Sequence, residues 1–445
     1  MDILVSAVPF LLFGAGSFYL VKLRFFYFLH PVKTFRALFE RREGSGVSPL
    51  SALSMALAGT LGVGNIVGVA SAICLGGAGA VFWMILSALL AMVLKYAEIV
   101  LAVVHRRFDG DGKPFGGAPY YIRRAFEGLR LLKVGRLTAG AFAALCIFNA
   151  IVMGNALQIN TVAGAFEGAF GISPLAVGIV IAVFCGVAVV GGVERIARIT
   201  GKLVPLMSLL FIGMCVAVIA LRWDMIPRAV SDIFYEAFDV RSAAGGIVGF
   251  IISGGVRYGT MRGLISNEAG CGTATMAHAT ADAVSPASQG VLGLVEVFVD
   301  TVLMCTLTAL VILVGVEDIG AFGDGYILLV QTAFESVLGA WAGNTLAIAV
   351  LLFGVATVLC QSHYGRTCLD YFTSSSGARF VYYTVFCVVT VVGSVVSPSA
   401  MFELADVGLA LMTFINITAL LLMSREVKEE TQAFLGNNKI KSRLS

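Results

Sequence analysis

Apolar runs of about 20 residues recur along the whole chain, and this feature most limits how the chain can fold. A helix needs about 20 apolar residues to cross roughly 30 Å of hydrocarbon. Of the 445 residues, 58% are hydrophobic and only 13% are charged, whereas soluble domains carry about 25% charged residues. So few charged residues could not cover a water-facing surface. We therefore expect an all-α polytopic protein of the lipid bilayer.

The charge balance and the cysteines exclude several other classes. The 30 Lys and Arg against 27 Asp and Glu leave a net charge of +3, too small to indicate a nucleic acid as partner. The nine Cys residues include no C-x-x-C pair and lie mostly inside apolar runs, so they predict neither a disulfide nor a metal cofactor. The chain has no H-E-x-x-H, no G-x-S-x-G and no grouped His. We therefore do not expect an enzyme.

The apolar pattern predicts eleven membrane spans. The first has no basic residue before it and no cleavage site after it, so it is expected to be a retained span rather than a signal peptide. The predicted spans are residues 3–21, 48–75, 80–104, 137–165, 174–191, 203–221, 244–265, 288–315, 343–362, 380–396 and 401–423.

Basic residues gather in alternate loops. Residues 22–44 and 105–136 are rich in Lys and Arg, whereas 316–342 contains acids and no Lys or Arg. The positive-inside rule then predicts an outside N-terminus and a cytoplasmic C-terminal tail in a plasma (inner) membrane. The loop 222–242, where four acids dilute three Arg residues, is the exception.

Two glycine clusters fall near the middle of predicted spans. Glycine makes up 51 of the 445 residues, and most of these glycines are explained by close packing of membrane helices. The clusters Gly59–Asn65 and Gly254–Gly259 predict interruptions of the second and seventh spans. An interrupted helix exposes backbone groups that lipid cannot satisfy, so each interruption should line a polar cavity. Each is a candidate binding site.

The two spans with predicted interruptions enter the membrane from opposite faces and are five spans apart. This arrangement predicts two inverted repeats, residues 45–222 and 243–424, with binding sites between them at the midplane. Residues 1–44 form a leading helix with a basic loop, and residues 425–445 form a cytoplasmic tail. The repeat is inferred from span count, orientation and break position, because the halves share no clear residue identity.

The first interruption offers groups for a zwitterion. The N–H groups after Gly62 and Gly64 suit a carboxylate, and the carbonyls that end the preceding half-helix suit Na⁺ or an ammonium group. Asn65 follows directly and can donate and accept hydrogen bonds. The alternative is a structural Asn that caps the second half-helix.

Polar residues in two other spans extend this site. On the fourth span, Gln158 is the residue expected to contact the cavity, with Asn155 on the same face and Asn160 to the side; interhelical hydrogen bonding is the alternative. On the ninth span, Thr357 and Gln361 are four apart and share one helix face. A Thr357 hydroxyl facing the carbonyls of the first interruption would complete an oxygen cage for a monovalent cation.

Two acids lie deep in the eighth span. Glu296 and Asp300 are four residues apart, and ionisable groups at this depth are candidates for proton or cation coupling. The alternative is that they are neutral or paired with Arg257 or Arg262.

Other titratable residues are expected to lie near the membrane surfaces. Lys95 and Glu98 fall near the inner end of the third span, where long side chains can reach the interface. The four His residues show no ligand spacing, and no chemistry is assigned to them.

Five motifs together resemble the alanine/glycine:cation symporter family, also called the sodium:alanine symporter family. They are Gly59–Ala70, Gly154–Gln158, Gly201–Pro205, Arg262–Gly270 and Val299–Thr301, and the similarity extends from about residue 45 to 424. The resemblance implies a LeuT-type fold of five plus five helices with one extra N-terminal helix. It also implies secondary active import of alanine or glycine with Na⁺, or in some members H⁺, by alternating access.

The resemblance also assigns roles to residues. By position, Asn65 and Gln158 match the polar substrate contacts of the family, and Thr357 matches its threonine on the ninth span. Together with the two interruptions, the predicted substrate-binding residues are Gly62, Gly64, Asn65, Gln158, Gly255, Val256 and Gln361. The predicted Na⁺ ligands are Ala58, Leu61 and Thr357.

The chain departs from the family at two positions. Ala356 precedes Thr357 where the family has Ser, which removes a hydroxyl from the ion site and makes H⁺ the alternative coupling ion. Gln361 replaces a Trp, which predicts a roomier or more polar pocket and allows a different small amino acid as substrate. The segment Ser266–Gly270 is expected at the inner membrane edge as part of a cytoplasmic gate; the alternative is that it is itself the second interruption.

The expected partners are thus a small amino acid, Na⁺ or H⁺, and the lipid bilayer, while the sequence predicts no oligomeric state. A channel is the less favoured alternative, because it should show pore-lining rings rather than two oppositely oriented interrupted helices.

Overall fold

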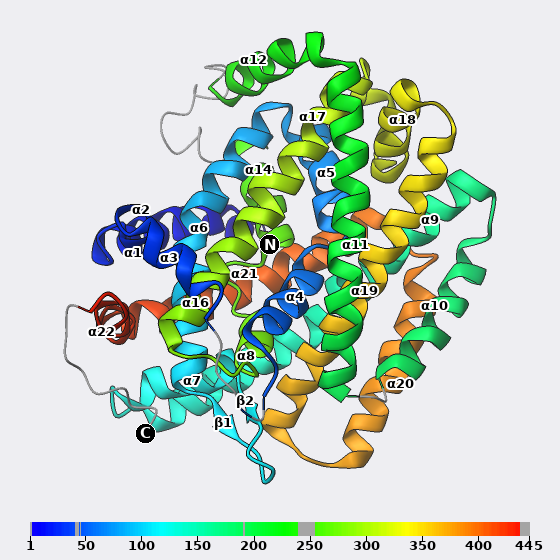
Figure 1. The fold of residues 1–445 in the computed structure, drawn as a ribbon. Helices are drawn as coiled ribbons and strands as arrows, with labels where there is room; N and C mark the ends of the chain where they lie inside the picture. Colours follow the sequence, from blue (N-terminus) through cyan, green and yellow to red (C-terminus); the bar gives the residue numbers. More distant parts are fainter. Residues whose placement is uncertain (1, 41–43, 45, 190–191, 239–253, 437–445) are drawn as a thin grey trace.

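The computed structural model is almost entirely helical (Figure 1), and it describes all residues except 1, 41–43, 45, 190–191, 239–253 and 437–445. The elements of the first half are α1 (Asp2–Lys22), α2 (Phe26–Leu29), α3 (Pro31–Ala37), α4 (Pro49–Thr60), η1 (Val63–Asn65), α5 (Val67–Gly76), α6 (Gly79–Val104), β1 (Arg107–Phe108), β2 (Pro114–Phe115), α7 (Ala118–Glu127), α8 (Leu132–Ile151), the π-helix η2 (Val152–Leu157), α9 (Gln158–Phe170), α10 (Pro174–Val189), α11 (Gly192–Leu221), η3 (Trp223–Met225) and α12 (Ile226–Ala237).

The second half begins at α14. Its elements are α14 (Gly254–Asn267), α15 (Thr275–His278), α16 (Pro286–Val297), the π-helix η5 (Phe298–Cys305), α17 (Thr306–Gly315), η6 (Ile319–Phe322), α18 (Tyr326–Leu338), α19 (Trp341–Phe372), α20 (Ser376–Gly393), α21 (Pro398–Leu422) and α22 (Ser424–Phe434). The two short strands form one antiparallel hairpin, in which Arg107 lies opposite Phe115.

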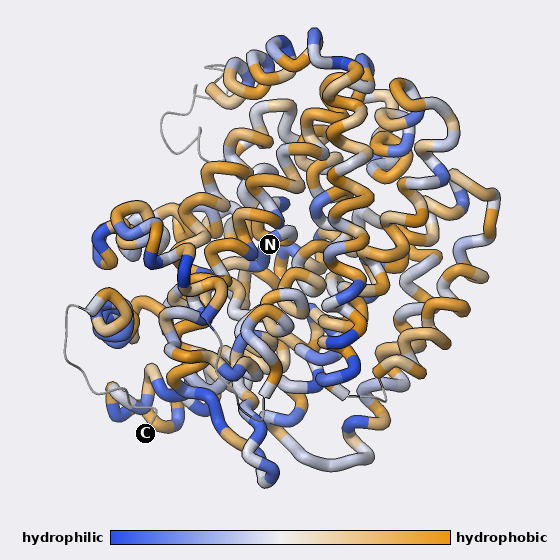
Figure 2. The backbone as a smooth tube through the Cα atoms, viewed as in Figure 1, coloured by the Kyte–Doolittle hydropathy of each residue, from blue (hydrophilic) through white to orange (hydrophobic). Residues whose placement is uncertain are grey.

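Many of these helices are built to cross a membrane. In the described part of the chain, eight are long and apolar enough to span a bilayer, and a ninth if α4 and α5 form one bent span. Large apolar side chains face outward, for example Val180 on α10, 68% exposed, and Leu209 on α11, 74% exposed. Figure 2 shows orange over most of the long helices, with blue concentrated at their ends and loops. A surface this apolar fits lipid rather than water, so the protein is a polytopic membrane protein.

Two helices that lead into the molecular centre begin at Ser-Pro pairs. The Ser48 hydroxyl accepts a hydrogen bond from the backbone N–H of Ser51 at the start of α4. Ser285 and Ser288 form a capping box at the start of α16. In both cases Pro occupies the first helical position, where its missing N–H costs nothing. Local sequence therefore sets where α4 and α16 begin.

The first predicted interruption is confirmed. Helix α4 ends at Thr60, η1 follows after Gly62, and the axes of the two half-helices differ by 58°. In Figure 1 this bent pair passes through the middle of the molecule, where α5 packs against α14.

The second predicted interruption is wrong. Gly254–Gly259 is regular α-helix at the start of α14, and the part of the predicted span before Gly254 lies outside the described residues. Gly255, Gly259 and Gly263 recur every four residues on the face that packs against α6, and a methyl group at Gly259 would collide with the carbonyl oxygen of Ala80. These glycines permit close helix packing and do not unwind the helix.

The second interruption lies one helix length further along the chain. Helix α14 ends at Asn267 and α15 begins at Thr275, and the segment between them has positive φ at Glu268 (50°), Gly270 (93°) and Gly272 (80°). Every residue from Gly259 to Ala281 is buried. The segment Ser266–Gly270 is thus part of the break itself, as the alternative prediction had it, and its assignment to a gate at the membrane edge is wrong. Glycines at two of the three positive-φ positions make this path possible.

Candidate functional site

The two interrupted helices meet in the interior. A methyl group on Gly64, in the first interruption, would stand 3.4 Å from the Cα of Ser266, at the edge of the second. Both residues are buried. Unwound backbone surrounded by protein is the arrangement in which polar groups at membrane depth are tolerated, so this junction is the candidate site.

Polar side chains from two helices hold the first interruption. Gln158 Oε1 accepts a hydrogen bond from the backbone N–H of Val63 at 2.9 Å, and the Thr357 hydroxyl donates to the carbonyl of Ala58 at 2.8 Å. A methyl group on Gly62 would stand 2.7 Å from Gln158 Oε1 and 2.8 Å from Thr357 Oγ1. The structure therefore requires glycine at Gly62. It brings together four of the predicted site residues, and a fifth, Leu61, directly precedes Gly62 in the chain: the four are Ala58, Gly62, Gln158 and Thr357.

Asn65 connects the two interruptions. Its Nδ2 lies 2.9 Å from Ser266 Oγ and 2.8 Å from both the carbonyl and Oδ1 of Asp300, so two amide hydrogens serve three oxygens. The other carboxylate oxygen of Asp300 accepts hydrogen bonds from Ser266 at 2.6 Å and Thr301 at 2.7 Å. Within the described residues Asn65 Oδ1 has no hydrogen-bond partner. Asn65 bonds across the interface, and the alternative of a local helix cap does not hold.

Gln361 forms a second bridge. Its Nε2 donates to Glu268 Oε1 at 2.7 Å and lies 3.4 Å from the carbonyl oxygen of Gly59. Glu268 also accepts a hydrogen bond from the hydroxyl of Thr273. Gln361 thus joins the end of α4 to the second unwound segment. A methyl group on Gly154 would collide with the Gln361 side chain, so α19 packs closely here on η2.

Two further side chains satisfy the second unwound backbone. Glu98 Oε1 accepts a hydrogen bond from the N–H of Gly272 at 3.0 Å, and Asn416 Nδ2 donates to the carbonyl of Gly270 at 2.9 Å and to Glu98. Glu98 is fully buried, so the prediction that it reaches the interface is wrong. Unwinding leaves backbone groups that need partners, and Glu98 supplies one.

The comparisons with known proteins agree with this geometry. The model of the sodium:alanine symporter family matches residues 2–444. The chain belongs to this family.

Similar proteins of known sequence cover nearly the whole chain. The sodium/alanine symporter AgcS of Methanococcus maripaludis is 34% identical over 429 residues, which are 95% of this chain and 93% of that protein. The probable sodium/glutamine symporter GlnT of Bacillus subtilis is 34% identical over 427 residues, 94% and 85% of the two chains. Among solved structures, a manganese transporter of Eremococcus coleocola aligns with a TM-score of 0.60 at 17% identity, over 88% of this chain and 81% of that chain. This last likeness concerns the fold alone.

In this member of the sodium:alanine symporter family, two predicted substrate residues lie away from the junction. Gly255 and Val256 are in the first turn of α14, where Gly255 packs near Gly76 and Ala80. Val256 is ten residues before Ser266, about 15 Å along the helix axis. The structure does not bring these two residues to the site, because the glycine cluster that suggested them is a packing stripe.

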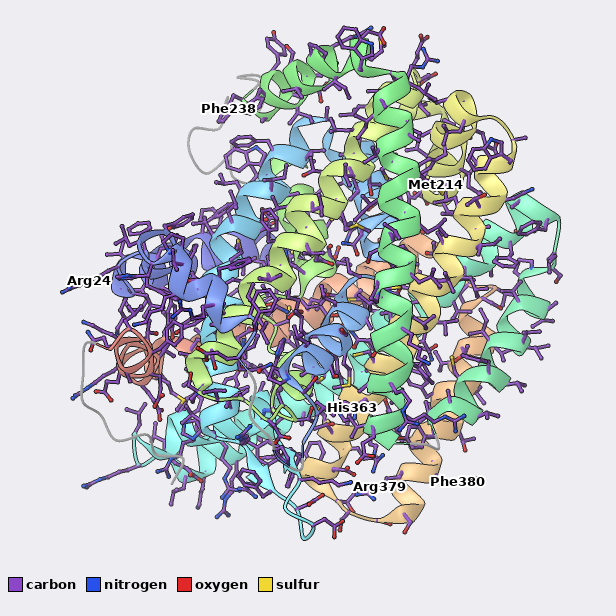
Figure 3. All side chains as sticks on the ribbon, viewed as in Figure 1. Arg24, Met214, Phe238, His363, Arg379 and Phe380 are labelled. Carbon is purple, nitrogen blue, oxygen red and sulfur yellow. The ribbon has the colours of Figure 1, made fainter. Side chains whose placement is uncertain are left out.

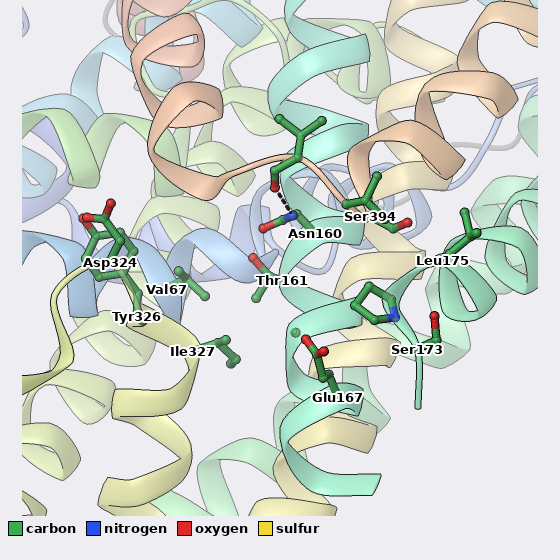
Figure 4. Close-up of a pocket in the computed structure, with 15 residues that line it drawn as sticks. Val67, Asn160, Thr161, Glu167, Ser173, Leu175, Asp324, Tyr326, Ile327 and Ser394 are labelled. Atoms are coloured by element: carbon green, nitrogen blue, oxygen red, sulfur yellow. Dashed lines mark hydrogen bonds between the residues drawn. The ribbon is translucent and has the colours of Figure 1, made fainter. Parts of the chain in front are cut away.

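Two other amides bind neighbouring helices. Asn155 Nδ2 donates to the carbonyl of Phe386 at 2.8 Å, and Asn160 Nδ2 donates to the carbonyls of Gly393 at 3.1 Å and Val396 at 2.6 Å. The Asn160 contact to Val396 borders a cavity of about 390 Å³ (Figure 4), which extends from α9 to the first residue of α5. For both residues the alternative of interhelical hydrogen bonding is correct.

A buried charge cluster lies beside the second interruption. Lys95 Nζ is 3.1 Å from Glu296 Oε1, and His278 Nε2 is 3.1 Å from Glu296 Oε2. All three side chains are fully buried. Arg262 instead pairs with Asp406 at 2.7 Å, so the alternative in which Arg262 pairs with the acids of the eighth span does not hold. The predicted surface position of Lys95 is wrong.

Sequence reasoning missed His278 and Lys95 as parts of this region, and it gave Ser266 and Glu268 only within the alternative location of the second interruption. One signal was available, because the segment Ser266–Gly272 combines polar residues with two glycines inside a predicted membrane protein. No local signal marked Lys95 or His278, since their partner comes from α16.

Proposed function

We propose that this protein is a secondary active symporter that imports a small neutral amino acid, alanine or glycine, together with Na⁺ by alternating access. The observation that carries the proposal is the buried junction of two interrupted helices, linked by Asn65. Names of relatives, a sodium/alanine symporter and a probable sodium/glutamine symporter, agree with a neutral amino acid and Na⁺.

The first interruption provides the amino-acid contacts. The substrate carboxylate would accept hydrogen bonds from the backbone N–H groups of Gly62, Val63 and Gly64. These groups lie at the N-terminal end of the second half-helix, which carries the positive end of the helix dipole. Gln158 now accepts the Val63 N–H, so it would exchange this bond for one to the substrate. Asn65 Oδ1, which lacks a partner in the described residues, is an acceptor for the ammonium group.

The ion contacts lie on the other side of the same interruption. The carbonyl of Ala58 and the hydroxyl of Thr357 are 2.8 Å apart, close enough for one small cation to bind both, and the carbonyl of Leu61 follows in the chain. Na⁺ prefers such oxygen ligands. Its inward movement supplies about 2.3 kcal/mol per 100 mV of membrane potential, in addition to its concentration gradient.

The proposed topology has eleven spans, with inverted repeats at residues 45–222 and 243–424, the N-terminus outside and the C-terminus in the cytoplasm of the plasma membrane. Each of the eleven predicted apolar segments overlaps a described helix. The interrupted helices belong to different repeats and meet at one point, as expected if one repeat rocks against the other around a central site.

A second function is favoured by one specific contact. Gln361 presents an amide to Glu268 at the position where the family resemblance implies a Trp, and a buried carboxylate in the site could carry a proton. This arrangement favours H⁺-coupled import of a more polar amino acid as the alternative.

Uptake into proteoliposomes distinguishes the Na⁺-coupled from the H⁺-coupled function. Radiolabelled alanine, glycine and glutamine are offered to vesicles with an inward Na⁺ gradient, with an inward pH gradient alone, or with neither. We expect concentrative uptake of alanine or glycine only with the Na⁺ gradient. Equal uptake with the pH gradient alone would assign the coupling to protons, and flux without accumulation would indicate a channel.

A further inference from the structure

A basic cavity lies where the end of α1, the short helix α2 and the C-terminal helix α22 meet. Its volume is about 230 Å³, and its lining includes the three cations Lys22, Arg24 and Lys428 together with His30. No acid is among the described residues that line it. Figure 3 shows Arg24 extending outward at the edge of this region. The cavity thus has an uncompensated positive lining and room for a phosphate group.

No ion pair with a described residue neutralises Lys22, Arg24 or Lys428. Lys22 Nζ donates to the hydroxyl of Ser424 at 2.7 Å and lies 4.9 Å from the ring centroid of Phe18. Neither Arg24 nor Lys428 has an ion pair with any residue that the structure describes. The C-terminal ends of α1 and α22 add about half a negative charge each, which does not balance three permanent cations.

Two of the three acids of α22 contact other partners, and the third, Glu430, does not line the cavity. Glu426 contacts His105 at 3.1 Å, and Glu429 contacts Arg425 at 2.8 Å. Helix α22 itself is held in place by the hydrogen bond between Thr431 and Tyr96. The positive charge of the cavity is therefore built into a fixed part of the fold.

An apolar face adjoins the cavity. Phe26 packs against Tyr96 of α6, with ring centroids 4.7 Å apart, and this contact turns the rest of α2 and α3 outward. Six large apolar side chains in this segment are 45% to 74% exposed: Phe25, Phe28, Leu29, Val32, Phe35 and Phe39. A short amphipathic segment with exposed aromatic residues and basic neighbours is typical of a helix that lies in the membrane interface.

We propose that this cavity binds the headgroup of an anionic phospholipid, with the acyl chains lying along the exposed face of α2 and α3. Charge complementarity selects the anionic headgroup, and the apolar face selects a lipid over a soluble phosphate. The leaflet is the cytoplasmic one if the proposed topology holds, since the loop 22–44 is one of the basic loops. Lipid binding at this site is independent of which amino acid or ion is transported.

Native mass spectrometry of the purified full-length protein tests this proposal. The protein in detergent is titrated with phosphatidylglycerol, with phosphatidylcholine of the same chains, and with glycerol phosphate. We expect one high-affinity phosphatidylglycerol site, at least tenfold weaker phosphatidylcholine binding, and no binding of glycerol phosphate at the same concentration. Each Lys near an anionic lipid contributes about a fivefold preference, so Lys22→Gln with Lys428→Gln should weaken phosphatidylglycerol binding about 25-fold.

A matched variant controls for general loss of positive charge. Lys133→Gln with Arg136→Gln removes two exposed charges of α8 outside the cavity and should leave the affinity unchanged. Because Lys22 also binds Ser424, Lys428→Gln alone provides a milder variant, with an expected fivefold loss. Equal affinities for the two lipids, equal affinities of the wild type and Lys428→Gln, or equally tight binding of glycerol phosphate would each overturn the proposal. Transport assays on the same preparations separate it from the proposed function, since lipid binding is measured without substrate.

Discussion

Replacement of Asn65 by Ala tests the central junction directly. The side chain of Asn65 is fully buried and is the amide that contacts both Ser266 and Asp300. The substitution removes the hydrogen bonds between the two interrupted helices and the acceptor proposed for the substrate ammonium group. Substrate affinity should fall strongly, while the protein still folds.

The expected size of the effect follows from the contacts. A hydrogen bond that involves a charged group contributes about 1.5 to 3 kcal/mol, which corresponds to a loss of affinity of about tenfold to 150-fold. The cost in stability is smaller, because Asp300 keeps the hydroxyl donors Ser266 and Thr301. We expect the melting temperature in detergent to fall by only a few degrees.

Asn155→Ala is the matched control. Asn155 is also a fully buried amide, with hydrogen bonds at 2.8 and 2.9 Å to Phe386 and Thr390 of α20. Asn155→Ala should lower the melting temperature about as much as Asn65→Ala does. Its affinity for radiolabelled alanine, measured by scintillation proximity on purified protein, should stay within about twofold of the wild-type value. If both variants lose affinity equally, or if Asn65→Ala binds as the wild type does, the assignment of Asn65 to the site is refuted.

Three further predictions concern the same region. Gly62→Ala should abolish uptake, because the added methyl group would lie within 2.8 Å of two side-chain oxygens. The control Gly68→Ala, with nothing within 4 Å of the added methyl group, should transport normally. Equal uptake by both variants would contradict the close packing at Gly62. Thr357→Ala should raise the Na⁺ concentration for half-maximal uptake at least tenfold through loss of an oxygen ligand, and an unchanged Na⁺ dependence would move the ion elsewhere. Lys95→Met should destabilise the protein by about 3 to 5 kcal/mol, since it leaves Glu296 as a buried charge without its ammonium partner. Adding Glu296→Met should restore most of the melting temperature. Failure of this rescue would show that the pair does not act as a unit.

The sequence alone predicted the membrane setting, the helices and the first interruption. These follow from local properties: the length of apolar runs, and the cluster Gly59–Asn65, whose glycines lie at the helix break. The neighbourhood of Gln158 and Thr357 was also predictable, because the family resemblance assigned both residues and helical periodicity placed Thr357 on one face with Gln361.

Only the tertiary structure decided which of the later glycine clusters unwinds its helix. Glycines in a membrane helix serve equally for unwinding and for close packing, and the choice depends on what faces them. Gly259 faces the backbone of α6 and stays helical, whereas Gly270 and Gly272 face Glu98 and Asn416, which bind the released backbone groups.

The position of the buried charges also depends on which groups face them in the folded chain. A local reading places Lys95 near a membrane surface, because a long side chain can reach water from there. Its position in the interior depends on Glu296 from α16, a helix about 200 residues further along the chain. A buried charge is tolerated only where its partner is, and the pairing of distant helices is a property of the folded chain rather than of any segment of the sequence.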